Sequence, residues 1–199
     1  EMYLFGQKVD FKGPKDAQEA GIAAVYQHPT SYPHLTVAEN IFMGHEIKKN
    51  HMIQWKAMNE EANKLLKQLN ADFDSTAEMG TLSVAQQQMV EIVKAVSFDG
   101  RIIVMDEPTS SLSNDEVEQL FGIIERLKAK QVSIIYISHR MEELFRISDR
   151  VTIIRDGAYV GTKKTSETNA NEMVAMRVGR EIESFYARDY NDLEHAETA

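Results

Sequence analysis

The feature that most constrains this chain is an apolar run that ends in two acidic residues. Residues 102–105, Ile-Ile-Val-Met, lead directly into Asp106 and Glu107, and Pro108 follows. A continuous apolar run with β-branched residues is typical of a strand buried on both faces of a parallel sheet. Pro108 has no N–H group and therefore ends the hydrogen-bonded ladder. We expect both carboxylates at the carboxyl end of this strand, where open α/β sheets bind their ligands.

Two adjacent carboxylates at a strand end suit nucleotide hydrolysis. Asp106 could act on Mg²⁺, and Glu107 could orient and deprotonate the attacking water. The alternative is an ordinary acidic turn, because Asp and Glu are common after strands. These two residues alone support both interpretations equally, so the remaining signals along the chain must decide.

Strand and helix patterns alternate along the chain, which predicts a mostly parallel α/β sheet. Strands are predicted at 22–25, 102–105, 132–137 and 151–154, with hairpins around residues 2–11 and at Asp156-Gly157. Helices are predicted to begin near 14, 36, 55, 83, 113, 141 and 169, two of them with capping boxes at Thr36 and Ser113. Residues 45–54 and 70–82 are predicted to be loops. Because 36–97 holds helices and no predicted strand, it resembles a helical insertion into the sheet domain.

Composition narrows the function classes. The net charge is −9, from 22 basic and 31 acidic residues, and no basic face is available for non-specific nucleic-acid binding. The absence of cysteine excludes a disulfide framework and a thiolate metal site. No apolar run approaches the ~18 residues of a membrane span. A membrane can therefore matter to this chain only through a partner.

Four short motifs occur along the chain, and their order is informative about the family. Gln27 follows a predicted strand, residues 82–86 (Leu-Ser-Val-Ala-Gln) open a helix, Asp106 and Glu107 end the central strand, and His139 follows the next strand. In this order they resemble the ATP-binding subunit of ABC transporters, over about residues 8–180. Residues 82–86 resemble the signature motif and 102–107 the Walker B motif with its catalytic glutamate. Gln27 resembles the Q-loop glutamine and His139 the H-loop histidine, while residues 111–113 occupy the D-loop.

The resemblance implies a P-loop NTPase-like (RecA-like) fold in which a mostly parallel sheet carries an inserted helical subdomain. The implied domains are an α/β ATPase core (1–30 and 98–165), a helical signature subdomain (31–97), a C-terminal helix (166–185) and a linker or tail (186–199).

The resemblance also implies an ATP and Mg²⁺ site with named roles. Glu107 would be the general base, a role worth ~10²–10⁴-fold in rate, and His139 would contact the γ-phosphate. Asp106 and Gln27 would act on Mg²⁺, through water. The nucleotide-binding residues would be Gln27, Ser83, Val84, Ala85, Gln86 and Asp106. The alternatives are structural: a turn residue for Gln27, a satisfied histidine for His139, and a plain helix cap for Ser83.

Residues 87–92, 136–141, 156–157 and 178–181 narrow the resemblance to the first half of the duplicated ATPases of simple-sugar importers, of the ribose, galactose and xylose types. Such a protein couples ATP hydrolysis to sugar import at the cytoplasmic face of the cell membrane, as a peripheral subunit. The implied partners are transmembrane permease subunits, a second ATPase half or copy in a head-to-tail sandwich, and indirectly a periplasmic or extracellular sugar-binding protein, but no nucleic acid. Residues 28–97, with Tyr32, Leu35 and Phe42, are the expected permease contact.

Two features depart from the family pattern. The phosphate-loop pattern (Walker A) G-x-x-x-x-G-K-[ST] does not occur in the 199 residues and would lie before residue 1. Without its lysine and amide cradle we expect this chain alone to lack ATPase activity. Val84 and Ala85 stand where the family has two glycines, and their side chains limit the approach of a phosphate.

Two other functions therefore stay open. One is a non-enzymatic domain that completes a partner's ATP site with its signature face. The other is a soluble ABC ATPase not linked to transport, which the acidic charge and residues 178–181 disfavour.

Overall fold

The computed structural model describes residues 1–26, 31–98 and 100–178. The chain divides into two compact units, Glu1–His139 and Arg140–Ala199. The predicted boundaries at residues 30, 98 and 165 stay a prediction.

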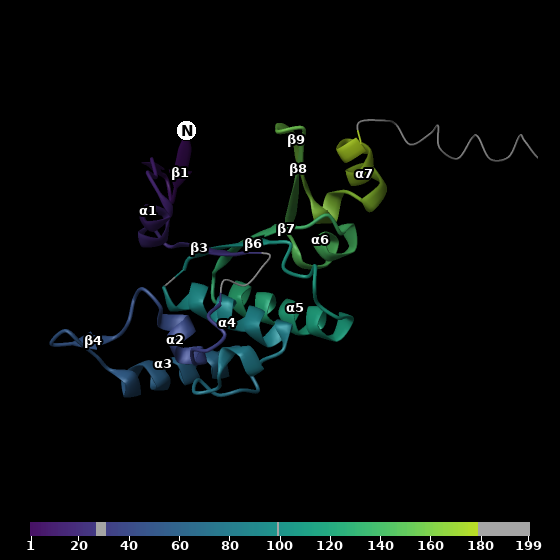
Figure 1. Cartoon of the computed structure of the whole chain (residues 1–199). Coiled ribbons are helices and arrows are strands. Elements are labelled where there is room, and N and C mark those ends of the chain that lie inside the picture. The colour runs from purple at the N-terminus through teal and green to yellow at the C-terminus, as the bar shows by residue number, and fades with distance from the viewer. Residues whose placement is uncertain (27–30, 99, 179–199) are drawn as a thin grey trace, which may run out of the picture. The chain divides into compact units, whose positions relative to one another are not determined.

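The first unit contains a three-stranded parallel sheet in the order β3 (Ile22–Val25), β6 (Ile102–Asp106) and β7 (Ser133–Ile137), as Figure 1 shows. The register pairs Val25 with Met105, Met105 with Tyr136, and Asp106 with Ile137. The carboxyl ends of the three strands therefore lie at one edge of the sheet. This arrangement confirms the predicted parallel sheet with residues 102–106 at its centre.

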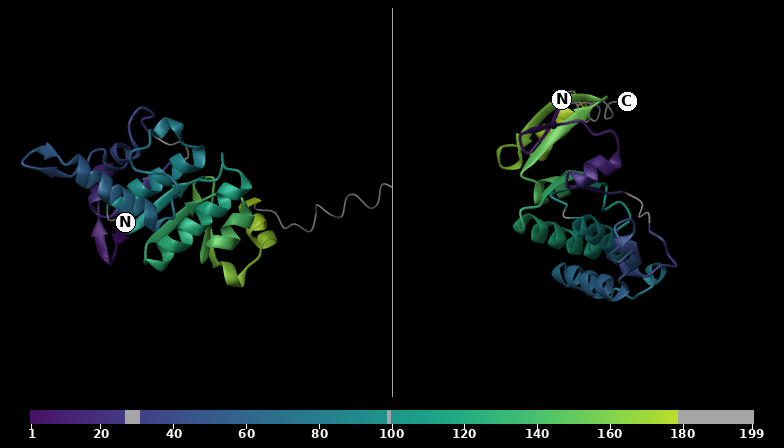
Figure 2. Two further views of the ribbon diagram at one scale, coloured as in Figure 1. Left: turned by 90° about the horizontal axis from the view of Figure 1, so that it is seen from below. Right: turned by 90° about the vertical axis from the view of Figure 1, so that its left-hand side faces the viewer.

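Helices α4 (Val84–Ser97) and α5 (Asn114–Ala129) lie along one side of this sheet (Figures 1 and 2). Alternate strand residues, including Val25, Ile103 and Met105, are buried. They meet an apolar core from the two helices, including Ile92, Val93, Ile123, Ile124 and Leu127. As predicted, Ser113 caps α5 in a capping box with Glu116.

The prediction that the central strand is buried on both faces is wrong for the described residues. Side chains alternate between the two faces of a strand, so the neighbours of Ile103 point the other way. Ile102 and Val104 are only partly buried on that face. On the same face of β7, Ile135 and Ile137 are exposed, at 53% and 47%. The apolar sequence of residues 102–105 suggested burial on both faces of β6, but among the described residues only the face with Ile103 and Met105 is buried.

Two more helices, α2 (Val37–Phe42) and α3 (Trp55–Gln68), pack against α4 and against each other. The predicted α3 stripe is confirmed, since Met58, Ala62 and Leu66 are fully buried. Phe42 is also buried, with 4% exposure, and its ring lies 5.2 Å from that of His45. It is therefore unavailable as the expected permease contact, whereas Tyr32 is 53% exposed.

The prediction of a plain loop at 45–54 is wrong. Two-residue strands β4 (Lys48–Lys49) and β5 (Met52–Ile53) pair antiparallel there. The turn residues Asn50 and His51 both have positive φ, of 50° and 63°. Such a turn matches the twist of paired strands and is most often marked by glycine, which is absent here. The short 3₁₀ helix Met79–Thr81 (η1) lies in the other predicted loop, 70–82.

The amino-terminal part of this unit agrees with the elements predicted from the sequence. Strands β1 (Met2–Leu4) and β2 (Gln7–Val9) form the predicted hairpin, and α1 (Pro14–Glu19) contacts β3. The Arg101 guanidinium stands 3.7 Å from the centre of the Phe5 ring, a cation–π contact that ties the hairpin turn to the start of β6.

The second unit contains α6 (Met141–Ile147), β8 (Arg150–Arg155), β9 (Ala158–Lys164), the 3₁₀ helix Thr165–Glu167 (η2) and α7 (Ala170–Val178). Asp156 and Gly157 form the predicted hairpin turn with positive φ, and Asn169 accepts a hydrogen bond from the Glu172 N–H. β8 pairs antiparallel with β9, as the predicted hairpin requires. The prediction that residues 151–154 also belong to the parallel sheet is wrong for the described residues, because β8 and β9 form a two-stranded sheet of their own. Across the described residues, no helix combines the length and apolarity needed to cross a bilayer.

Candidate functional site

Glu107 follows β6 in a conformation that directs the chain away from the ladder. Its φ is 44°, and its N–H donates a 2.9 Å hydrogen bond to the Ile137 carbonyl at the end of β7. A non-glycine residue in this region costs on the order of 1–2 kcal/mol, so the surrounding structure must hold it there. Ser110 N–H donates to the Glu107 carbonyl at 3.2 Å and closes the turn. These two hydrogen bonds hold the turn that follows β6.

The structure brings Glu107 and His139 together. His139 Nδ1 lies 3.0 Å from Glu107 Oε1, and the two side chains are 60% and 31% exposed. The contact exists because β6 and β7 are adjacent and parallel, so both residues leave the sheet at the same edge. Residue-by-residue reasoning assigned each a separate role and missed the pair. The pair could have been predicted from one feature: each residue comes shortly after the end of one of two neighbouring strands.

This pair has a defined chemistry. A carboxylate accepts hydrogen bonds, so His139 donates from Nδ1, and the hydrogen bond orients the imidazole ring. Nε2 can then donate to a phosphate oxygen only if the ring carries both protons. Glu107 has a second oxygen, which remains able to accept a proton from water. One carboxylate can thus orient the histidine and serve as a general base.

Asp106 is the last residue of β6 and is exposed. Among the described residues, no three His, Asp or Glu side chains gather closely enough to hold a metal ion by themselves. Mg²⁺ usually keeps several waters and takes one or two carboxylates together with substrate phosphates. An exposed carboxylate at a strand end can supply one such protein ligand to Mg²⁺, directly or through water. Gln27, the other predicted Mg²⁺ contact, lies outside the described residues.

Residues 83–86 begin α4 and are exposed or partly exposed. Ser83 Oγ accepts the Gln86 N–H at 3.2 Å, and the Ser83 N–H donates to Gln86 Oε1 at 3.0 Å, which is a capping box. The Ser83 hydroxyl still has its own hydrogen to donate, so capping and phosphate binding can coexist. Val84 is 46% exposed, and Ala85 is partly exposed beside it. The open amino end of this helix carries the positive end of its dipole.

The chain also matches known proteins. A family model described as ABC transporter matches residues 1–110, which is more than half of the chain. The chain belongs to the ABC transporter family. The predicted membership of that family is thereby confirmed, whereas the roles of the motif residues stay a prediction.

Curated relatives in this family include ribose import proteins. "Ribose import ATP-binding protein RbsA 1" of Burkholderia ambifaria is 45% identical over 194 residues, which are 96% of this chain and 38% of the relative. "Ribose import ATP-binding protein RbsA" of Lactococcus lactis subsp. cremoris is 50% identical over 177 residues, or 88% of this chain and 36% of the relative. The chain thus spans little more than a third of the length of these relatives.

Solved structures confirm the predicted fold class. The ADP conformation of MJ1267, an ATP-binding cassette of an ABC transporter, superposes with a TM-score of 0.73 at 25% identity. The match covers 88% of this chain and 76% of that one. A nucleotide-free ATP-binding cassette from an ABC transporter gives a TM-score of 0.71 at 24% identity, over 88% of this chain and 72% of that one. The α/β architecture is therefore that of an ABC-type ATP-binding cassette.

Proposed function

We propose that this chain is part of an ATPase that couples ATP hydrolysis to the import of a simple sugar. The observation that carries the proposal is the Glu107–His139 pair, 3.0 Å apart at the ends of adjacent parallel strands. The names of the ribose-import relatives supply the sugar class. The acidic net charge of −9 disfavours the alternative of an ATPase that acts on nucleic acid.

The residues divide the work within this proposal. Glu107 takes the proton of the attacking water, and His139, held by Glu107, positions the terminal phosphate. Asp106 contributes one oxygen toward Mg²⁺, which when bound would neutralise phosphate charge. Ser83, with the backbone of residues 84–86, binds the nucleotide of a second ATPase half or copy. Gln27 is proposed to contact Mg²⁺ or its water.

The partners follow from the same proposal. Transmembrane permease subunits would supply the sugar pathway, and a second ATPase half or copy would complete a head-to-tail sandwich. A sugar-binding protein would take part indirectly, and the chain would act at the cytoplasmic face of the membrane. Tyr32, which is exposed in the described structure, remains a proposed contact for a permease subunit.

Substitution of Glu107 by glutamine tests the catalytic role in the full-length protein. Glu107→Gln should lower ATP turnover by ~10²-fold or more, because the base acts in the chemical step, and nucleotide affinity should stay nearly unchanged. Steady-state turnover, nucleotide binding and ribose uptake into vesicles are the measurements. Glu60→Gln on α3 is the matched control, since Glu60 is exposed and its ion pair with Lys56 is long, at 3.9 Å.

Two results would contradict parts of the proposal. If Glu107→Gln abolishes nucleotide binding together with turnover, Glu107 holds the site together and is not the base. If the wild-type protein hydrolyses ATP but does not associate with membrane subunits, the soluble ATPase is the better interpretation.

A further inference from the structure

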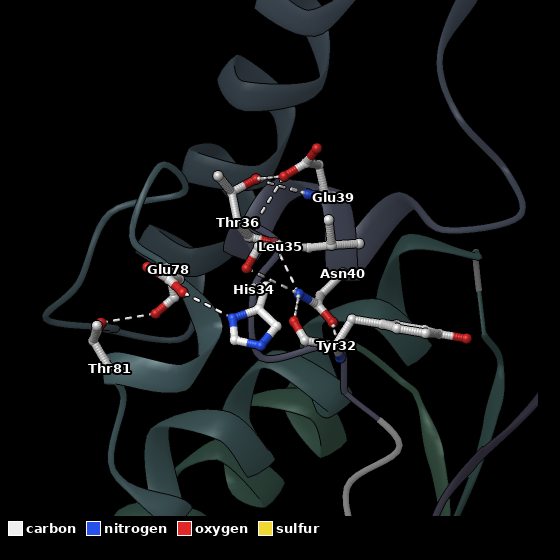
Figure 3. Close-up of polar contacts among 8 residues, drawn as sticks. All are labelled: Tyr32, His34, Leu35, Thr36, Glu39, Asn40, Glu78 and Thr81. Atoms are coloured by element: carbon white, nitrogen blue, oxygen red, sulfur yellow. Dashed lines mark hydrogen bonds and ion pairs between the residues drawn. The ribbon is translucent and has the colours of Figure 1, made fainter.

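A buried asparagine holds the segment that precedes α2. Asn40 is 3% exposed, and its amide contacts the backbone of residues 32–36 (Figure 3). The Tyr32 N–H donates to Asn40 Oδ1 at 2.8 Å, while Asn40 Nδ2 donates to the carbonyls of Thr36 at 2.9 Å and Tyr32 at 3.1 Å. A backbone N–H can only donate, so the amide has one workable orientation. Asn40 therefore fixes the path of this segment through hydrogen bonds at Tyr32 and at Thr36.

The same segment is hydrogen-bonded to the residues that lead into α4. Val37 and Ala38 N–H groups donate to the carbonyls of Ala77 and Ser75, both at 2.9 Å. In the reverse direction, Met79 N–H donates to Leu35 at 2.9 Å and Gly80 N–H donates to Pro33 at 2.8 Å. We call this pair of segments, residues 32–38 and 75–80, the strap. Its two halves are far apart in sequence but act as one hydrogen-bonded piece.

The strap is tightly packed. A Cβ atom on Gly80 would lie 3.1 Å from the Pro33 carbonyl oxygen and 3.2 Å from Pro33 Cβ, closer than most such contacts. Met79 is fully buried, which anchors the second half in the core. His34 and Glu78 add an exposed ion pair at 3.5 Å (Figure 3), which contributes little by comparison. Backbone hydrogen bonds and close packing therefore fix the strap.

The strap lies between two predicted nucleotide-contacting residues in sequence. Its first half starts at Tyr32, shortly after Gln27, and its second half ends at Gly80, shortly before Ser83. We propose that Asn40 is a positioning residue, which through the strap sets the position of Ser83 and the first turn of α4. The proposal rests on the proposed nucleotide role of residues 83–86.

Substitution of Asn40 by aspartate in the full-length protein tests this inference. Asp keeps the shape and the acceptor for Tyr32 but loses both N–H donors, and it places a charge beside carbonyl oxygens. Loss of the hydrogen bonds that Asn40 Nδ2 donates, with a carboxylate placed beside the carbonyls of Tyr32 and Thr36, should raise amide hydrogen exchange at Met79 and Gly80 by about tenfold. The kcat for ATP should fall by about tenfold with little change in KM, because the signature segment acts in the transition state. Nucleotide-binding stoichiometry should stay unchanged, which separates mispositioning from unfolding.

Two further variants make the test decisive. Asn171→Asp is the matched control, because Asn171 is exposed on α7, and it should change neither exchange nor turnover. Gly80→Ala perturbs the strap from its other half and should act in the same direction; it replaces Asn40→Asp if that variant fails to fold.

The exchange and turnover data can fail independently. Wild-type exchange at Met79 and Gly80 in Asn40→Asp would overturn the strap. Faster exchange with wild-type kcat would overturn the positioning role. A wild-type protein without ATP turnover would overturn the proposed function, and the exchange data would still decide whether Asn40 holds the strap.

Discussion

The Ser83 hydroxyl can be assigned by a pair of substitutions, because its two proposed roles need different chemistry. As a helix cap it accepts the Gln86 N–H at 3.2 Å, and as a phosphate ligand it would donate its own hydrogen. Ser83→Ala removes both functions. Ser83→Asp keeps a good capping acceptor at the amino end of α4 but has no donor and repels a phosphate. The two variants therefore separate stability from nucleotide binding.

The structure sets the expected size of the capping effect. Loss of a capping side chain costs ~1 kcal/mol, with a range of about 0.5–2 kcal/mol. Here the helix end is exposed, so water can replace the lost acceptor, and the Ser83 N–H to Gln86 Oε1 bond at 3.0 Å survives in alanine. The lower half of the range therefore applies. Exchange of the first-turn amides of α4 should rise by about two- to fivefold in Ser83→Ala and stay near wild type in Ser83→Asp.

ATP turnover of the full-length protein should depend on whether residue 83 can donate a hydrogen bond, and not on whether it caps α4. A hydrogen bond to a charged group contributes about 1.5–3 kcal/mol, so both variants should lose roughly tenfold or more in ATP turnover. Asn169→Asp is the matched control, since Asn169 Oδ1 accepts the Glu172 N–H at the start of α7, outside the proposed site. Wild-type turnover in Ser83→Asp would refute the reasoning and leave Ser83 as a cap alone.

Two further predictions concern histidines. His139→Gln in the full-length protein should lower ATP turnover by about 10²-fold, because the oriented imidazole beside Glu107 is lost; exposed His51→Gln is the control, and turnover within about twofold of wild type would contradict the role. Burial, with a smaller contribution from Lys94, lowers the pKa of His45 below its usual 6.5. The unfolded histidine therefore binds a proton at a higher pH than the folded one, so its contribution to stability is present above about pH 6.5 and is lost as the pH falls through that value toward the folded pKa. His45→Gln should flatten the fall of the urea midpoint between about pH 7 and 5, and identical slopes would exclude His45 as the responsible group.

Local features of this protein are determined by the sequence itself. The capping boxes at Thr36 and Ser113 join residues three positions apart, and the stripe on α3 repeats with the helical period. The turn at Asp156-Gly157 needs only two residues that tolerate positive φ. These interactions span a few residues, so the pattern of side chains suffices to predict them. The order of the family's motifs is likewise a property of the chain alone.

Two local features were not predicted from the sequence, for different reasons. The hairpin at β4 and β5 turns on Asn50 and His51, which adopt positive φ without a glycine to announce it. Asn40 gave no signal as a buried residue, since asparagine in a helix is ordinarily exposed. It is buried because backbone groups of residues 32–36 fold back onto it.

Tertiary structure alone decided the geometry of the candidate site. Glu107 and His139 are 32 positions apart in sequence, and their 3.0 Å contact depends on β7 pairing with β6. Strand neighbours are chosen by how the sheet buries its apolar face under α4 and α5, which no short window of sequence contains. The same choice left Ile135 and Ile137 exposed on the opposite face, although three of the five residues of β7 are isoleucine. The residue types at the site could be predicted from the chain, whereas their pairing required the fold.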